Sequence, residues 1–109
     1  MTEKKKQDNT MDNLQTGGQA SVSSHVVVAN QLGLHARPAG KIAKAAQDFS
    51  CSIQLVHAEQ EADATSILDI LTLAAVEGSK LEIRAEGDDA EKAIEKLAKM
   101  FQEKFGEER

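Results

Sequence analysis

The sequence predicts an α+β fold in which helices cover one face of a small antiparallel sheet. Segments of alternating or β-branched residues are interleaved with segments that repeat apolar residues at helical spacing, in the order β-α-β-β-α-β-α. The helical segments are amphipathic, as expected for helices that pack on a sheet and face water on their other side. The core has to be aliphatic, since the only aromatic residues are three phenylalanines.

The first half of the predicted fold is a strand, a helix and a second strand. Residues 21–29, SVSSHVVVA, are β-branched and predict a strand. Residues 35–49 repeat apolar side chains at i, i+3, i+4 and i+7, which predicts a helix. Pro38 falls in its first turn, where the missing N–H does no harm. Residues 51–57, CSIQLVH, alternate between two faces and predict a half-buried strand.

The second half begins with a polar segment, residues 58–64, which predicts a turn and a short edge strand. Residues 65–75, TSILDILTLAA, predict a short buried helix with Thr65 or Ser66 as its N-cap. Residues 81–85, LEIRA, alternate again and predict the last strand.

The final predicted helix has the clearest pattern. Asp88 is its expected N-cap, with Glu91 three residues later in the manner of a capping box. One face of the helix is apolar through to the end of the repeat. The residues of this face are Ala90, Ile94, Leu97, Phe101 and Phe105.

Two regions differ in composition. Residues 1–21 are polar and almost free of branched apolar side chains, which predicts a disordered tail. Residues 22–109 carry the strand and helix patterns, and their length suits a single domain.

Composition excludes several function classes. The formal net charge of −5 disfavours a general nucleic-acid binder. Cys51 is the single cysteine, so no internal disulfide is expected, and no Cys/His spacing predicts a zinc site or another metal or cofactor site. No apolar run approaches the roughly 20 residues that span a bilayer, and no apolar segment follows the basic cluster Lys4 to Lys6. We therefore expect a cytoplasmic protein without membrane insertion.

Residues 30–40, NQLGLHARPAG, place His35 between a turn and the start of a helix. If the helix begins at Ala36, His35 is its N-cap or the residue just before it. The first-turn amides of Ala36, Arg37 and Ala39 then lack intrahelical acceptors, at the positive end of the helix dipole. This environment favours the neutral, nucleophilic form of the ring and an anion placed beside it.

Basic residues continue from this point along the predicted helix. Arg37 can grip phosphate oxygens in a fork, and Lys41 and Lys44 follow at i+4 and i+7. In an acidic chain, this stripe is a candidate docking surface for an acidic partner. Spacing alone also allows the plainer interpretations, a capping or surface histidine and a solvated basic face.

Two long segments resemble the HPr family, the histidine phosphocarriers of the phosphoenolpyruvate:sugar phosphotransferase system. They are GLHARPAG with the KIAKAAQDF that follows it, and ADATSILDILTLAAVEGSKLEIRAEGDDAEKAIEKL. The resemblance covers roughly residues 22–105. It implies an open-faced β-sandwich, a four-stranded antiparallel sheet with three helices on one face.

The resemblance also implies a function for His35. This histidine would accept a phosphoryl group on Nδ1 from phosphorylated Enzyme I and pass it to an enzyme IIA domain for sugar uptake. Arg37 matches the family arginine that assists at this site. The chain would be a carrier rather than an enzyme, without a cofactor, and we expect a monomer. The partner-binding residues would include Lys41, Lys44, Ile67 and Leu71.

Ser66 aligns with the serine that an HPr kinase/phosphorylase modifies in many bacteria. Phosphate there would add about −1.5 to −2 charges at a helix start and would repel acidic partners. A plain N-cap is the equal alternative for this serine.

The sequence does not decide between the sugar pathway and other branches of the family. Asp69, Leu71 and Gln47 depart from residues common in sugar-pathway carriers, and parts of NQLGLHARPA and ATSILDILTL resemble the nitrogen-related branch (NPr). A purely regulatory HPr-like protein that acts by binding partner proteins is a further alternative. We interpret His25 and His57 as structural or surface residues, and Cys51 as a small core residue.

Overall fold

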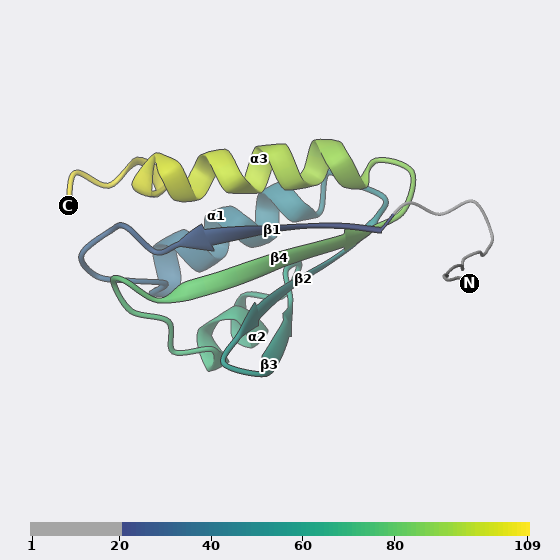
Figure 1. Ribbon diagram of the computed structural model, residues 1–109. Helices are drawn as coiled ribbons and strands as arrows, with labels where there is room; N and C mark the ends of the chain where they lie inside the picture. Colours follow the sequence, from purple (N-terminus) through teal and green to yellow (C-terminus); the bar gives the residue numbers. More distant parts are fainter. Residues whose placement is uncertain (1–20) are drawn as a thin grey trace, which may run out of the picture.

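The computed structural model describes residues 21–109 and confirms the predicted order of elements (Figure 1). The predicted tail lies outside the described residues except for Ser21, which begins the first strand, and so it stays a prediction. The elements are β1 (Ser21–Val27), α1 (Ala36–Ala46), β2 (Ser52–His57), β3 (Gln60–Asp63), α2 (Ile67–Thr72), β4 (Lys80–Glu86), α3 (Ala90–Gln102) and the 3-10 turn η2 (Lys104–Gly106).

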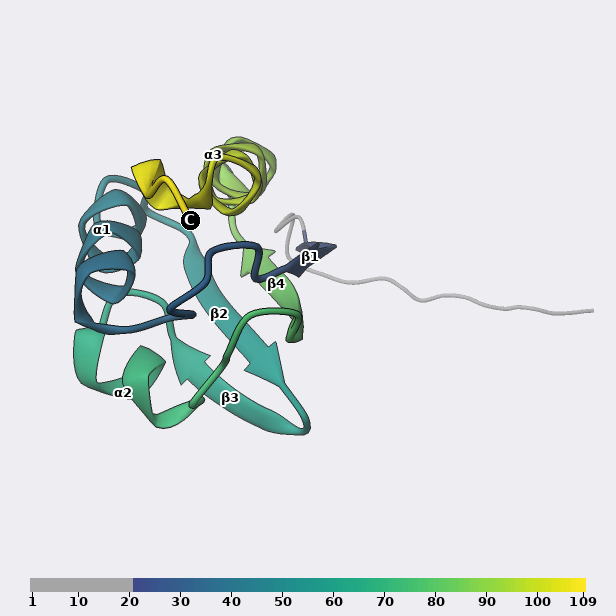
Figure 2. The ribbon, with the colours of Figure 1, turned by 90° about the vertical axis from the view of Figure 1, so that its left-hand side faces the viewer.

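The four strands form one antiparallel sheet in the order β1-β4-β2-β3. Figure 2, which looks nearly along the strands, shows the helices on one side of the sheet and the other side uncovered. The predicted open-faced α+β sandwich is therefore confirmed. No helix in the described part of the chain is both long enough and apolar enough to cross a membrane.

Alternation along the strands separates the core from the open face. In β4, Leu81, Ile83 and Ala85 are buried under the helices, whereas Glu82 and Arg84 point to the other side. The core is aliphatic as predicted, apart from two phenylalanines from the end of the chain. The largest fully buried side chains include Phe101, Ile42, Leu55, Ile70, Leu73, Leu81, Ile83 and Leu97.

The predicted helix over residues 65–75 is shorter in the structure. Ser66 is its N-cap and accepts a hydrogen bond from the amide of Asp69 at 3.2 Å, but the helix ends at Thr72. Ala74 has a φ of 51°, in the left-handed region, which stops the helical repeat. The apolar pattern of this segment continued past the point at which the backbone turns.

The predicted N-terminus of the last helix is wrong in detail. Asp89, rather than Asp88, is the N-cap of α3, and its side chain makes no cap hydrogen bond. Its carboxylate instead accepts hydrogen bonds from the amides of Ser50 and Cys51, each at 2.9 Å. These contacts tie the start of α3 to the start of β2. They hold the pKa of Asp89 below its usual value, chiefly through the Ser50 amide.

Replacing Asp89 with alanine is expected to lower the urea midpoint of unfolding in a pH-dependent way. Because the folded pKa of Asp89 is below the unfolded one, its contribution is present above the ordinary aspartate pKa and is lost as the pH falls through the folded value. The difference between wild type and Asp89→Ala should be largest near neutral pH and shrink toward about pH 2. Asp88→Ala, at an exposed neighbour, is the control. A pH-independent difference would contradict this account.

The predicted apolar face of the last helix is also corrected at its end. The α-helix stops at Gln102, and Phe105 lies beyond it with a φ of 55°. Phe105 is nevertheless buried, at 3% exposure, and its ring meets that of Phe101 edge to face with centroids 4.9 Å apart. The burial was predicted correctly although the backbone there is not α-helical. The turn leaves the C-terminus at the same end of the molecule as the β1–α1 loop (Figures 1 and 2).

Candidate functional site

His35 is the N-cap of α1, as the sequence predicted. Its own side chain makes no cap hydrogen bond, so the imidazole is free to point elsewhere. Its carbonyl accepts the amide of Ala39 at 3.0 Å, so that amide is not free, contrary to the prediction. The first-turn amides that helix geometry leaves without an i−4 acceptor are those of Ala36 and Arg37.

The loop before His35 has a fixed shape. Gly33 has a φ of 70°, and a Cβ on it would lie 2.5 Å from the carbonyl oxygen of Ala75, so only glycine fits there without a shift. Leu34 donates its amide to the same Ala75 oxygen at 3.0 Å. The buried Asn30 closes the loop by donating from Nδ2 to the Gly33 carbonyl at 2.7 Å. The glycine and the buried amide together set the position of His35.

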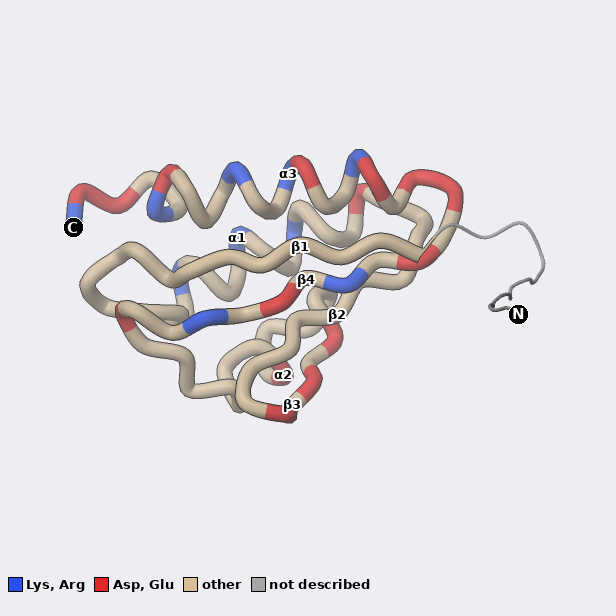
Figure 3. Tube along the Cα trace, viewed as in Figure 1, with Lys and Arg blue, Asp and Glu red and all other residues tan. Residues whose placement is uncertain are grey.

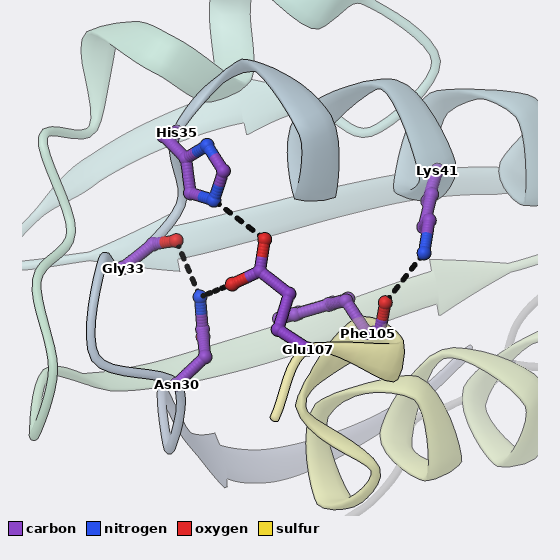
Figure 4. Close-up of polar contacts among 6 residues, drawn as sticks. All are labelled: Asn30, Gly33, His35, Lys41, Phe105 and Glu107. Atoms are coloured by element: carbon purple, nitrogen blue, oxygen red, sulfur yellow. Dashed lines mark hydrogen bonds and ion pairs between the residues drawn. The ribbon is translucent and has the colours of Figure 1, made fainter. Parts of the chain in front are cut away.

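Glu107 lies directly against the His35 ring (Figure 4). Its Oε2 is 2.7 Å from Nε2 of His35, and its Oε1 accepts from Nδ2 of Asn30 at 2.9 Å. Burial opposes ionisation of this carboxyl, but hydrogen bonds from Asn30 and His35 and the charges of His35 and Arg37 outweigh it and lower the pKa of Glu107. Sequence reasoning missed this residue, which lies 72 positions from His35.

The contact with Glu107 distinguishes the two ring nitrogens of His35. An ionised carboxylate can only accept a hydrogen bond, so Nε2 carries the hydrogen of this contact. In the neutral ring, the lone pair is then on Nδ1. Figure 4 shows this second nitrogen on the side of the ring that faces away from Glu107. The nitrogen available as a nucleophile is therefore Nδ1.

An open hollow of about 520 Å³ surrounds the ring. It brings together His35 and Arg37, two of the predicted site residues, with Arg109 from the C-terminus. Two guanidinium groups and a helix N-terminus make this hollow suitable for an anion. The hollow is lined by Gln31, Leu32, His35, Arg37, Gly106, Glu107, Glu108 and Arg109.

The predicted basic stripe follows α1, where Figure 3 shows blue segments at intervals along the helix. Arg37, Lys41 and Lys44 are all exposed. Of the three, only Arg37 lines the hollow. Lys41 donates from Nζ to the Phe105 carbonyl at 2.6 Å, so this lysine also fastens the C-terminal turn to α1.

Ser66 lies away from the hollow. The end of α1 is tied to the start of α2 by Gln47, whose Nε2 donates to the Thr65 carbonyl at 3.1 Å. Because His35 begins the 11-residue helix and Gln47 ends it, Ser66 is beside the opposite end of α1. The exposed apolar side chains that follow are Ile67, Leu68 and Leu71. Leu68 is the most exposed of these, at 75%, and sequence reasoning had not singled it out.

The other histidines and the cysteine lie outside this site. His25 is exposed on β1, and Nδ1 of His57 is 3.1 Å from the Leu73 carbonyl. Burial, with the neighbouring Asp89 carboxylate, raises the pKa of the Cys51 thiol to about 11, so the thiol stays protonated at neutral pH. Within residues 21–109, no group of three or more side chains is arranged to hold a metal ion.

Comparisons with known proteins converge on one family. Residues 22–103 match the family model described as the PTS HPr component phosphorylation site. The chain is 42% identical to the phosphocarrier protein HPr of Treponema pallidum over 83 residues, which cover 76% of this chain and 94% of that protein. It is 37% identical to the phosphocarrier protein NPr of Shewanella violacea over 82 residues, which cover 75% of this chain and 90% of that protein.

A solved structure gives the same result. The crystal structure of HPr-C-His from Thermoanaerobacter tengcongensis superposes with a TM-score of 0.78 at 36% sequence identity. The match covers 81% of this chain and 99% of that one. The similarity therefore extends over nearly the whole length of these relatives and includes the loop and helix that carry His35.

Proposed function

The chain belongs to the HPr family of phosphocarrier proteins of the phosphotransferase system, and on that premise we propose that His35 is its phosphorylated residue. The observation that supports this proposal is the position of the His35 ring at the N-terminus of α1, where Glu107 holds Nε2 and Nδ1 is left free. The donor is phosphorylated Enzyme I. The acceptor is an enzyme IIA domain that serves sugar uptake.

The proposed step is attack by the Nδ1 lone pair of His35 on the phosphorus of the donor. The N–P bond forms as the bond between phosphorus and the donor breaks. The phosphoryl oxygens then lie at the N-terminal end of α1, where free amides and the helix dipole favour negative charge. Arg37, in the same hollow, supplies a guanidinium to these oxygens.

Partner binding is assigned to the surface that extends from this hollow along α1 to the exposed side of α2. Arg37, Lys41 and Lys44 offer positive charge along α1, which suits partners with acidic surfaces. Beside α1, the exposed apolar residues Ile67 and Leu71 of α2 offer area that a partner can bury. Cations and apolar side chains thus face a partner together.

Incubation with Enzyme I and phosphoenolpyruvate labelled in its phosphoryl group tests the proposal. We expect a single label per chain that is labile in acid and stable in base, as a phosphoramidate is, and that moves on when an enzyme IIA domain is added. A chain that takes no label, or takes a base-labile one, contradicts the proposal. A reaction without Enzyme I is the control.

Relatives named NPr favour a second candidate, the nitrogen-related branch. The two branches differ in the acceptor rather than in the chemistry at His35. Transfer from the labelled chain to a sugar-specific IIA domain, compared with transfer to a nitrogen-type IIA domain, separates them. Faster transfer to the nitrogen-type domain would overturn the assignment to sugar uptake.

Regulation at Ser66 is the remaining part of the proposal. Ser66 Oγ already accepts the amide of Asp69 at the start of α2, so a phosphate there would keep a cap while adding negative charge beside Ile67 and Leu68. We expect Ser66→Asp to slow label uptake from Enzyme I, while Ser66→Ala keeps normal uptake and loses about 1 kcal/mol of stability through the missing cap. Equal rates of label uptake in Ser66→Asp and Ser66→Ala would contradict a regulatory role for Ser66.

A further inference from the structure

The end of the chain is folded back onto His35 by a turn that the backbone does not favour. Lys104, Phe105 and Gly106 have φ values of 56°, 55° and 81°, and two of the three are not glycine. One buried contact and one at the surface hold this conformation. The Phe105 ring packs into the core against Phe101, and Lys41 donates to the Phe105 carbonyl at 2.6 Å. The turn is therefore anchored on both the core and α1.

This turn places Glu107 between the His35 ring and the buried Asn30. Its carboxylate is 2.7 Å from Nε2 of His35 and 2.9 Å from Nδ2 of Asn30. Asn30 is fully buried and also bonded to the Gly33 carbonyl, so it cannot follow a moving carboxylate. The Glu107 side chain is itself only 14% exposed. The His35 ring is thus held against a rigid acceptor.

We propose that Glu107 is a positioning residue that keeps the Nε2 proton on His35 throughout phosphoryl transfer. This inference rests on the proposed phosphorylation of His35. Before transfer, the contact turns the ring so that Nδ1 presents its lone pair. After transfer, the same carboxylate retains the proton on the opposite nitrogen.

The proton matters because of charge balance in the onward step. When Nδ1 forms its bond to phosphorus and Nε2 keeps its hydrogen, the phosphorylated ring of His35 carries a positive charge, which the Glu107 carboxylate stabilises. When the N–P bond breaks, its electron pair returns to Nδ1 and the ring leaves as neutral imidazole. Without the Nε2 proton the ring would leave as an anion, a much poorer leaving group.

Other charged groups surround the ring without taking this role. Arg37 from α1 and Arg109 from the C-terminus line the hollow and favour the phosphoryl oxygens, and Glu108 lines it as well. Among residues 21–109, Glu107 is the charged side chain in contact with the His35 ring. The inference therefore concerns Glu107 and not its acidic neighbour.

The test compares the full-length wild-type chain with Glu107→Gln, Glu107→Ala and the control Glu103→Gln, at an exposed carboxyl that does not line the hollow. Each is phosphorylated with Enzyme I and phosphoenolpyruvate and then purified. Loss of the phosphoryl group to water is followed by ³¹P NMR from acidic to alkaline pH, with no partner present. The ¹⁵N shifts of the unphosphorylated rings report which nitrogen carries the hydrogen.

Both Glu107 variants should lose the phosphoryl group about tenfold more slowly at the alkaline end, because their pH profiles shift about one unit toward lower pH. Glu107→Gln keeps a carbonyl acceptor and should retain the Nε2–H form, whereas Glu107→Ala should lose part of it. Glu103→Gln should match wild type. Superimposable pH profiles in all four chains would overturn only the role proposed for Glu107 and would leave the phosphorylation of His35 intact. Failure of the wild-type chain to take up phosphate would instead overturn the phosphorylation of His35.

Discussion

Replacing His35 with alanine is expected to abolish phosphoryl uptake from Enzyme I. Neither of the other histidines can substitute for it. His25 is exposed within β1 rather than at a helix start, and Nδ1 of His57 is engaged with the Leu73 carbonyl. Neither lines the hollow that contains Arg37. The measurement is label incorporation from phosphoenolpyruvate, with far-UV circular dichroism to verify that the variant is folded.

The variants His25→Ala and His57→Ala are the matched controls for this experiment. Both should take up label at the wild-type rate, since neither removes a group from the hollow around His35. Uptake that persists in His35→Ala, or disappears in one of the controls while its fold is intact, would place the acceptor elsewhere in the chain.

Replacing Phe101 with alanine is expected to lower the free energy of unfolding by about 3–5 kcal/mol. Phe101 is 1% exposed and is among the largest fully buried side chains, packed where α3 covers the sheet. Its removal leaves a cavity and also deprives Phe105 of its edge-to-face partner. A domain of this size is stable by only about 5–15 kcal/mol, so the variant should lose a large share of its stability.

Urea unfolding followed by far-UV circular dichroism measures the effect of Phe101→Ala, because the chain has no tryptophan or tyrosine for fluorescence. Phe49→Ala is the control, since Phe49 is only partly buried at the edge of the core. Phe49→Ala should lower the free energy of unfolding by less than half as much as Phe101→Ala does. A loss below about 1 kcal/mol for Phe101→Ala would contradict the packing described here.

Local patterns predicted the elements that hold the site. The repeat of Ala39, Ile42 and Ala46 placed one face of α1 in the core, and Pro38 located its first turn. These features were enough to put His35 at a helix N-terminus. They depend on neighbours within one or two turns of the chain, which is why a single sequence contains them.

Contacts between distant segments were not predictable in this way. The capping pattern pointed to Asp88, but Asp89 is the N-cap of α3, and its carboxylate accepts hydrogen bonds from the amides of Ser50 and Cys51, 39 and 38 positions away. Glu107 had no local signal as a site residue, because its position depends on left-handed backbone at Lys104 and Phe105. The one available hint was Gly106, a residue tolerant of positive φ just after the helical repeat ends.

Lys41 illustrates how one residue can satisfy two interpretations. Its spacing from Arg37 predicted a charged stripe, and it is exposed on α1 as expected. Its Nζ also holds the Phe105 carbonyl, a contact that no spacing rule contains. The surface that was predicted as a docking face is therefore joined to the turn that positions Glu107.

The most direct measurement is the location of the phosphoryl group on the phosphorylated chain by ¹H–¹⁵N and ³¹P NMR with ¹⁵N-labelled histidine. The structure predicts one phosphohistidine, at His35, with phosphorus bonded to Nδ1 and the hydrogen retained on Nε2 facing Glu107. A phosphoryl group on Nε2 of His35, or on any other residue, would contradict it.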